Sequence, residues 1–143
     1  NLTGRAHMMS AAMMGATAFQ KGLGAIHALS HPIGAIYHTH HGTTNAVVMQ
    51  AVMRFNRSEI EDRFVSAARY LDIEGGFDGF YDFVGGLVTH LNIPKNLTDL
   101  GLRDLGNADF DRIVAAALND PSAGGNPRAL TAKNTRALLE ACF

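Results

Sequence analysis

The sequence lacks three features that each define a class of protein. No stretch approaches the roughly 20 continuous apolar residues of a membrane span, so no contact with a membrane is expected. The formal net charge is only −1, whereas a nucleic-acid-binding protein needs a basic face to neutralise phosphates. The single cysteine, Cys142, has no partner for an internal disulfide, which indicates a reducing compartment. We therefore expect a cytoplasmic protein that binds neither membranes nor nucleic acid.

Signals for β-strands and for a secretory leader are also missing. No segment alternates apolar and polar residues with the β-branched enrichment of a strand. The chain opens on Asn1, without an initiator methionine or a signal peptide, and runs directly into a helical pattern. This beginning predicts a fragment or a processed product rather than a complete gene product.

Helical spacing, by contrast, recurs along the whole sequence. Its 143 residues suit one domain, and a composition that is 47% hydrophobic and 17% charged suits a packed core. The spacing of apolar residues predicts an all-α bundle of about six helices. The helical segments cover residues 9–20, 25–31, 45–55, 58–71, 77–91, 107–118 and 131–143.

Three of the expected boundaries depend on specific local chemistry. Pro32 pushes the residue before it out of the α region, so the second helix should end near His31. Ser58 and Glu61 have the spacing of a capping box, which predicts that a new helix starts there. The prolines and glycines of residues 120–128 predict a loop.

Most of the seven histidines cluster early in the chain. His27 and His31 are four residues apart, so a helix presents them on one face, and His41 follows after a polar loop. Neutral imidazole is a good ligand for divalent iron and zinc, and these three residues would form one wall of a metal site. A His-x-x-x-His pair alone also suits a solvated helix face, and His38 and His40 suit a polar surface loop.

The residues around these histidines are more specific than the histidine spacing. Residues 22–35 read GLGAIHALSHPIGA, and residues 41–47 read HGTTNAV. Together they resemble the signature of the iron-containing alcohol dehydrogenases, in which a Gly-rich turn leads into His-x-x-x-His-Pro-x-Gly and then His-Gly-x-x-Asn-Ala. Weaker matches follow at residues 54–56 and 124–128, so the resemblance covers nearly the whole chain.

The resemblance implies both a fold and a function. The fold is the helical C-terminal domain of the dehydroquinate synthase-like architecture, with residues 1–143 forming a single metal-binding domain. His27 and His41 would bind Fe²⁺ or Zn²⁺, and His31 would be the catalytic residue that relays the substrate proton. The full-length enzyme would interconvert a small alcohol and its aldehyde or ketone with NAD or NADP, as a homo-oligomer.

Half of the implied active site is missing from the sequence. The family uses four protein ligands, and no segment matches the helix that supplies the other two, an Asp and a His. His7 and His90 remain as candidates, but neither lies in a matching motif. No Gly-x-Gly-x-x-Gly follows a strand, so no cofactor-binding residue is expected here. In the family that the sequence resembles, the nicotinamide cofactor binds mainly to an N-terminal α/β domain, and the resemblance implies that this domain lies upstream of Asn1. The isolated chain is therefore expected to be inactive.

Two alternatives remain open. A glycerol dehydrogenase or a dehydroquinate synthase would share the architecture and the histidine placement, although the run of residues 31–34 favours an alcohol dehydrogenase. A stand-alone helical module that binds a metal or a partner without catalysis also fits.

The sequence departs from the family where Gln50 and Ala51 stand in place of proline and histidine, and where His40 stands in place of proline.

Overall fold

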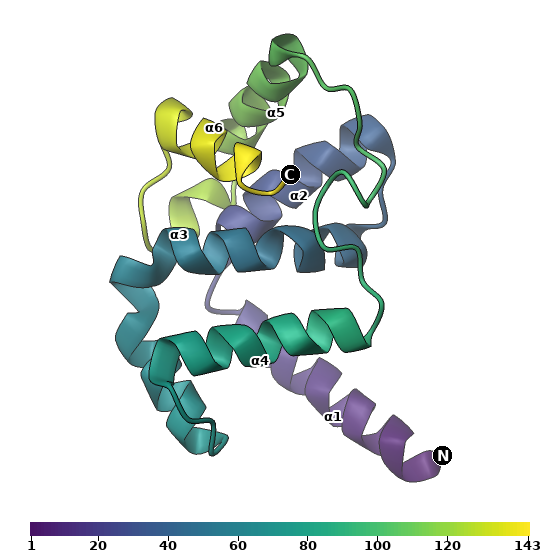
Figure 1. Cartoon of the computed structure of the whole chain (residues 1–143), viewed down its shortest axis with the longest axis vertical. Helices are drawn as coiled ribbons and strands as arrows, with labels where there is room; N and C mark the ends of the chain where they lie inside the picture. Colours follow the sequence, from purple (N-terminus) through teal and green to yellow (C-terminus); the bar gives the residue numbers. More distant parts are fainter.

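The structure, a computed structural model, describes all of residues 1–143 and consists only of helices, turns and loops (Figure 1). The helices are α1 (Leu2–Phe19), α2 (Ala25–Tyr37), α3 (His41–Tyr70), α4 (Gly76–His90), α5 (Asn107–Asn119), the short 3₁₀ helix η1 (Ala123–Gly125) and α6 (Ala132–Glu140). The expected all-α class with about six helices is confirmed. None of the helices combines the length and the apolar character that crossing a membrane requires.

The hydrophobic core surrounds α2. Leu29 and Ile33 of α2 are completely buried, and this helix packs against both α3 and α5. Val48 of α3 and Ile113 of α5 belong to the same buried cluster. Leu97, in the loop between α4 and α5, closes the cluster, and its backbone N–H donates to the carbonyl of Cys142 at 2.8 Å. The core therefore joins α2, α3, α5 and α6, whereas α1 lies apart from it (Figure 1).

The prediction that the second helix ends near His31 is wrong, because α2 continues through Pro32 to its end at Tyr37. A proline inside a helix costs about 3 kcal/mol, since it removes one backbone hydrogen bond and crowds the preceding turn. Leu29 and Ile33 flank Pro32 and both are fully buried, which stabilises the helix by about 1.5–3 kcal/mol for each side chain. Burial of this helical face therefore offsets the cost of the proline.

The prediction that a new helix starts at Ser58 is also wrong. α3 runs from His41 to Tyr70 as one helix, although it bends and its second half leaves the core (Figure 1). The Ser58 hydroxyl donates to the side chain of Glu59 at 3.1 Å and caps nothing. Backbone N–H groups inside a helix already bond to carbonyls four residues earlier, so a capping side chain finds no free donor there.

The last helix begins as its sequence predicts. Thr131 is the N-cap of α6, and its side chain accepts a hydrogen bond from the backbone N–H of Asn134. The Asn134 side chain accepts in return from the backbone N–H of Thr131 at 2.7 Å. α5 begins at Asn107, as the sequence predicts, and its N-cap is Gly106, whose backbone N–H donates to the Asp109 carboxylate at 2.9 Å.

A buried pair of asparagines joins three segments that are far apart in the sequence. Asn126, in the loop after η1, exchanges hydrogen bonds of 2.7 and 2.9 Å with Asn56 of α3. The side-chain oxygen of Asn126 also accepts the backbone N–H of Ala25, the first residue of α2, at 3.0 Å. Gly24, the N-cap of α2, has no side chain that could accept a hydrogen bond from this N–H group. Asn126 therefore caps α2 from the other end of the chain.

Two glycines make this close approach of backbone segments feasible. A Cβ on Gly24 would stand 2.9 Å from the side-chain oxygen of Asn126. A Cβ on Gly125 would overlap the carbonyl oxygen of Leu23. The turn before α2 and the loop after η1 touch each other at these positions, so residues with side chains would push them apart.

We expect Asn126→Ala to lower the free energy of unfolding by about 3 kcal/mol. The substitution leaves the Ala25 N–H and the Asn56 amide buried without partners, and each such loss costs about 1–3 kcal/mol. Urea unfolding followed by circular dichroism measures the change.

The matched control is Asn119→Ala. Asn119 is exposed, and its side chain bonds only to the carbonyl of Ala115 within α5. Its replacement should change the free energy of unfolding by no more than about 0.5 kcal/mol. Equal losses in the Asn126 and Asn119 variants would contradict the bridging role of Asn126.

Candidate metal centre

Three histidines from two helices come together beside the core. His27 and His31 lie on one face of α2, and His41 is the first residue of α3. The ring centroids of His27 and His31 are 5.5 Å apart, those of His27 and His41 are 5.3 Å apart, and those of His31 and His41 are 5.5 Å apart. The structure thus brings together all three histidines that the sequence singles out.

The short connection between α2 and α3 places His41 against α2. His38 follows α2 in a left-handed conformation with φ of 56°, which reverses the chain. His40 is the N-cap of α3, and its Nδ1 accepts the backbone N–H of Thr43 at 3.3 Å. The hydroxyl of Thr44 donates to the carbonyl of His40 at 3.0 Å. His40 therefore caps a helix in this structure.

Asn45 lies between two of the three imidazoles. Its side-chain nitrogen is 3.3 Å from Nε2 of His27 and 3.1 Å from Nε2 of His41. Because an amide N–H donates, both Nε2 atoms direct their lone pairs toward one point, and the unprotonated nitrogen is the form of imidazole that binds metals. The side-chain oxygen of Asn45 is buried without a hydrogen-bond partner. Sequence reasoning assigned Asn45 no role, although it lies in the family-like string of residues 41–47.

The surroundings of His27 favour its neutral form. Burial lowers the pKa of His27, and the nearby imidazoles of His31 and His41 lower it further, against an opposing influence of Asp120. The ring of Phe19 meets the His27 ring edge-on, with the centroids 5.8 Å apart. A neutral imidazole keeps a lone pair available for a metal.

His31 has a different partner from the other two histidines. Its Nδ1 is 2.8 Å from Oδ2 of Asp120, in the loop after α5. The other carboxylate oxygen of Asp120 accepts the backbone N–H of Ser122 at 2.8 Å. Burial by itself would raise the pKa of Asp120, but the hydrogen bonds from Ser122 and His31 outweigh this and lower it. Asp120 therefore stays ionised and orients the ring of His31.

Sequence reasoning missed Asp120. The residue stands in the proline- and glycine-containing loop of residues 120–128 and is separated from His31 by 89 positions. Its only local signal is the turn that follows α5. The contact with His31 depends on the packing of α5 against α2, which no short motif encodes.

This chain offers two ligands to a metal ion, which is fewer than a metal centre needs. His27 and His41 offer two imidazole nitrogens, which iron and zinc both accept. No group of three or more His, Cys, Asp or Glu side chains is arranged to hold a metal ion. His7 lies on α1 and His90 ends α4, and the ring contacts of the three clustered histidines include neither of them. A catalytic site normally uses at least three protein ligands, so two imidazoles need further donors.

Known sequences that are similar to this chain point to one protein family. The model of the Fe-containing alcohol dehydrogenase family, C-terminal, matches residues 1–143. The chain is similar to a 4-hydroxybutyrate dehydrogenase from Cupriavidus necator, with 39% identity over 95% of this chain and 37% of the relative. It is also similar to a lactaldehyde reductase from Escherichia coli (strain K12), with 34% identity over 77% of this chain and 30% of the relative.

Solved structures lead to the same family. An alcohol dehydrogenase from Oenococcus oeni superimposes with a TM-score of 0.89 at 26% identity and covers 100% of this chain and 39% of its own. A 1,3-propanediol oxidoreductase gives a TM-score of 0.76 at 29% identity over 85% of this chain and 33% of its own. The chain thus spans between 30% and 39% of the length of these relatives. It belongs to the Fe-containing alcohol dehydrogenase family and corresponds to the C-terminal part of that family.

Proposed function

We propose that this chain is the metal-binding helical part of an NAD(P)-dependent alcohol dehydrogenase that interconverts a small alcohol and its aldehyde or ketone. The observation that carries the proposal is the convergence of the His27 and His41 Nε2 atoms on Asn45, with His31 beside them. The names of the relatives, which include a 4-hydroxybutyrate dehydrogenase and a lactaldehyde reductase, support a small alcohol or aldehyde as substrate.

His27 and His41 are the two metal ligands in this proposal. Their shared orientation toward Asn45 and the lowered pKa of His27 support this role. Iron is the metal that the family description names, and we propose Fe²⁺, although Zn²⁺ accepts the same donors. When bound, such a metal supplies Lewis-acid polarisation of a hydroxyl or carbonyl oxygen.

His31 is the proton carrier in this proposal. The Asp120 carboxylate can only accept, so it favours the tautomer of the neutral ring that carries its proton on Nδ1, and in that tautomer Nε2 has a lone pair for the proton that a substrate hydroxyl loses. The His31 side chain is 41% exposed, so it can pass this proton on to water. A nicotinamide cofactor, when bound by the rest of the enzyme, would supply the acceptor for the hydride that oxidation of the alcohol also releases. His31 thus takes the substrate proton in this proposal, and Asp120 holds its ring in the orientation for this role.

The helix α1 supports the presence of a further domain in the working enzyme. α1 has no buried residue and projects away from the other helices (Figure 1). It exposes Met9, Met13 and Phe19 among other large apolar side chains, which a monomeric protein normally covers. We propose that a nucleotide-binding α/β domain outside residues 1–143 covers α1, binds NAD or NADP and supplies the remaining metal ligands. The complete enzyme is a cytoplasmic homo-oligomer in this proposal.

Substitution of the three histidines in the full-length enzyme tests their separate roles. His27→Ala and His41→Ala should each abolish both bound metal and activity, because each removes one ligand. His31→Ala should retain metal and lower the turnover number by about 100-fold, in the range for loss of a general acid–base group. Metal analysis by inductively coupled plasma mass spectrometry and steady-state kinetics measure these effects. Loss of metal in all three variants would contradict the assignment of His31.

Asp120→Asn tests whether the carboxylate orients His31. The amide is uncharged and no longer stabilises one tautomer of the ring, so turnover should fall about 10–100-fold while the metal content stays unchanged. Asp99→Asn is the matched control, because Asp99 is an exposed loop residue that forms no ion pair. An Asp120 variant as active as the Asp99 variant would rule out the orienting role.

Residues 1–143 alone should show no alcohol-dependent reduction of NAD or NADP. The chain has only two of the proposed metal ligands and no nucleotide-binding fold. Absorbance at the wavelength of the reduced nicotinamide measures the activity, and circular dichroism verifies that the chain is helical. Turnover by the isolated chain would show that the domain proposal is wrong.

A further inference from the structure

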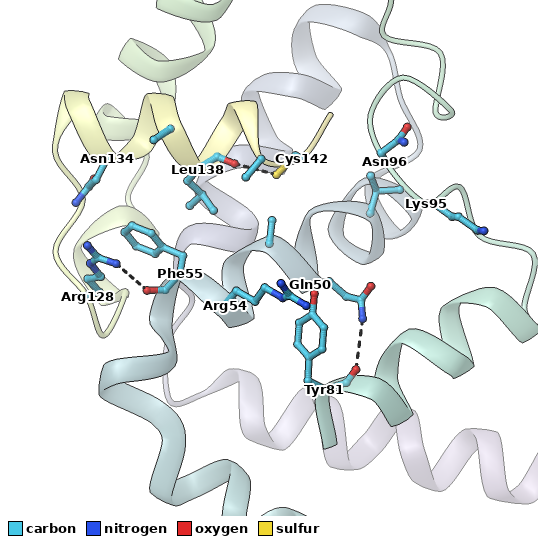
Figure 2. A pocket seen from close by; sticks show the side chains of 14 residues that line it. Gln50, Arg54, Phe55, Tyr81, Lys95, Asn96, Arg128, Asn134, Leu138 and Cys142 are labelled. Carbon is cyan, nitrogen blue, oxygen red and sulfur yellow. Dashed lines mark hydrogen bonds between the residues drawn. The ribbon is translucent and has the colours of Figure 1, made fainter. Parts of the chain in front are cut away.

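A cleft of about 630 Å³ opens between α3, α4 and α6, and none of the three clustered histidines lines it (Figure 2). One side is formed by α3, with Gln50, Arg54 and Phe55 among the lining residues. Tyr81 of α4 and Leu138 of α6 face it from the neighbouring helices. Small-molecule sites in proteins generally have volumes of about 300–1,000 Å³, so the cleft is large enough to hold a small organic ligand.

The charged side chains that line this cleft are all basic. They are Arg54, Lys95 and Arg128, and no Asp or Glu lines it. Figure 2 shows Arg54 beside Tyr81 in the middle of the cleft, with Arg128 toward one end and Lys95 toward the other. The chain as a whole has 12 basic and 13 acidic residues, so a cleft with three cations and no carboxylate differs from the average surface.

These cations lack carboxylate partners, unlike others in the chain. Arg57 pairs with Glu61 and Asp78, and Arg136 pairs with Asp111 and Glu140. By contrast, none of the three cations of the cleft takes part in an ion pair. The positive charge of the cleft is therefore not neutralised by the chain itself.

Aromatic rings hold two of the guanidinium groups in place. Arg54 lies over the ring of Tyr81 at 4.6 Å, and Arg128 lies over the ring of Phe55 at 4.4 Å. Stacking of this kind orients a guanidinium group and directs its N–H donors outward at the edge. One of these donors in Arg128 bonds to the carbonyl of Phe55 at 3.1 Å. Asp82 lines an adjoining hollow that shares Arg54, but it forms no ion pair with this residue. Arg54 therefore has N–H donors available for an anion.

The floor of the cleft is apolar and uncharged. Val47 and Leu138 are both buried and contribute to the lining. Cys142 also lines the cleft, and its thiol donates to the carbonyl of Leu138 at 3.2 Å. Burial raises the pKa of Cys142 to about 12, so the thiol stays neutral. An apolar group can lie on this floor without meeting a negative charge.

We propose that this cleft binds a small organic carboxylate, with the carboxylate held by Arg54 and the apolar chain on the floor formed by Val47 and Leu138. A guanidinium group matches a carboxylate through two parallel N–H···O bonds, which a neutral head group cannot accept equally well. Lys95 and Arg128 add to the positive field from the two ends of the cleft.

Isothermal titration calorimetry of the full-length protein with hexanoate tests this proposal, with hexanamide as the neutral ligand of the same shape. Hexanoate should bind saturably, more tightly than hexanamide, and more weakly as the salt concentration rises. Arg54→Gln should weaken hexanoate binding by about tenfold, as expected when a hydrogen-bonded charge is lost. Lys95→Gln, in a loop, should weaken it less and serves as a second variant.

The matched control is Arg63→Gln, because Arg63 is an exposed residue of the same helix that does not line the cleft. This variant should bind hexanoate as the unsubstituted protein does. The proposal is overturned if hexanoate does not bind, if hexanamide binds as tightly, or if the Arg54 and Arg63 variants bind hexanoate equally.

Discussion

The arrangement of the site depends on one buried hydrogen-bond network, in which Asn126 caps α2 and pairs with Asn56 of α3. Both asparagine side chains are buried, so their polar groups must find partners within the protein. The network sets where α2 begins, and His27 follows this start within the first helical turn. The segment between α5 and α6 that contains Asn126 also carries Asp120, which contacts His31 one turn further along α2. This segment therefore contacts α2 at two points, through Asn126 at Ala25 and through Asp120 at His31.

The three clustered histidines have the same side chain but different neighbours. His27 and His41 face the amide of Asn45, whereas His31 faces the carboxylate of Asp120. An amide N–H pairs with an imidazole nitrogen that presents its lone pair, and a carboxylate accepts a hydrogen bond from the ring nitrogen that carries a proton. The division between proposed metal ligands and proposed proton carrier thus follows from their neighbours.

Much of the fold could be predicted from local patterns. The apolar spacing indicated the helices, and Thr131 marked the start of α6 because its side chain satisfies a free backbone N–H. Local rules failed at Pro32 and Ser58, where a helix continues through each residue. Burial of the neighbouring apolar face outweighs the cost of the proline, and the interior of α3 offers the serine no free donor. Both failures occur where packing competes with a local preference.

The sequence by itself determined the all-α class, and its strings of residues around His27, His31 and His41 led to the family. Only the tertiary structure decided which side chains these histidines meet. Asp120 reaches His31 across 89 positions, and the cations of the cleft come from three separate segments. A local sequence pattern reflects interactions between residues that are a few positions apart. These contacts join residues that are far apart in the sequence and form only when helices pack and bury their apolar faces. The partners of a site residue are therefore a property of packing.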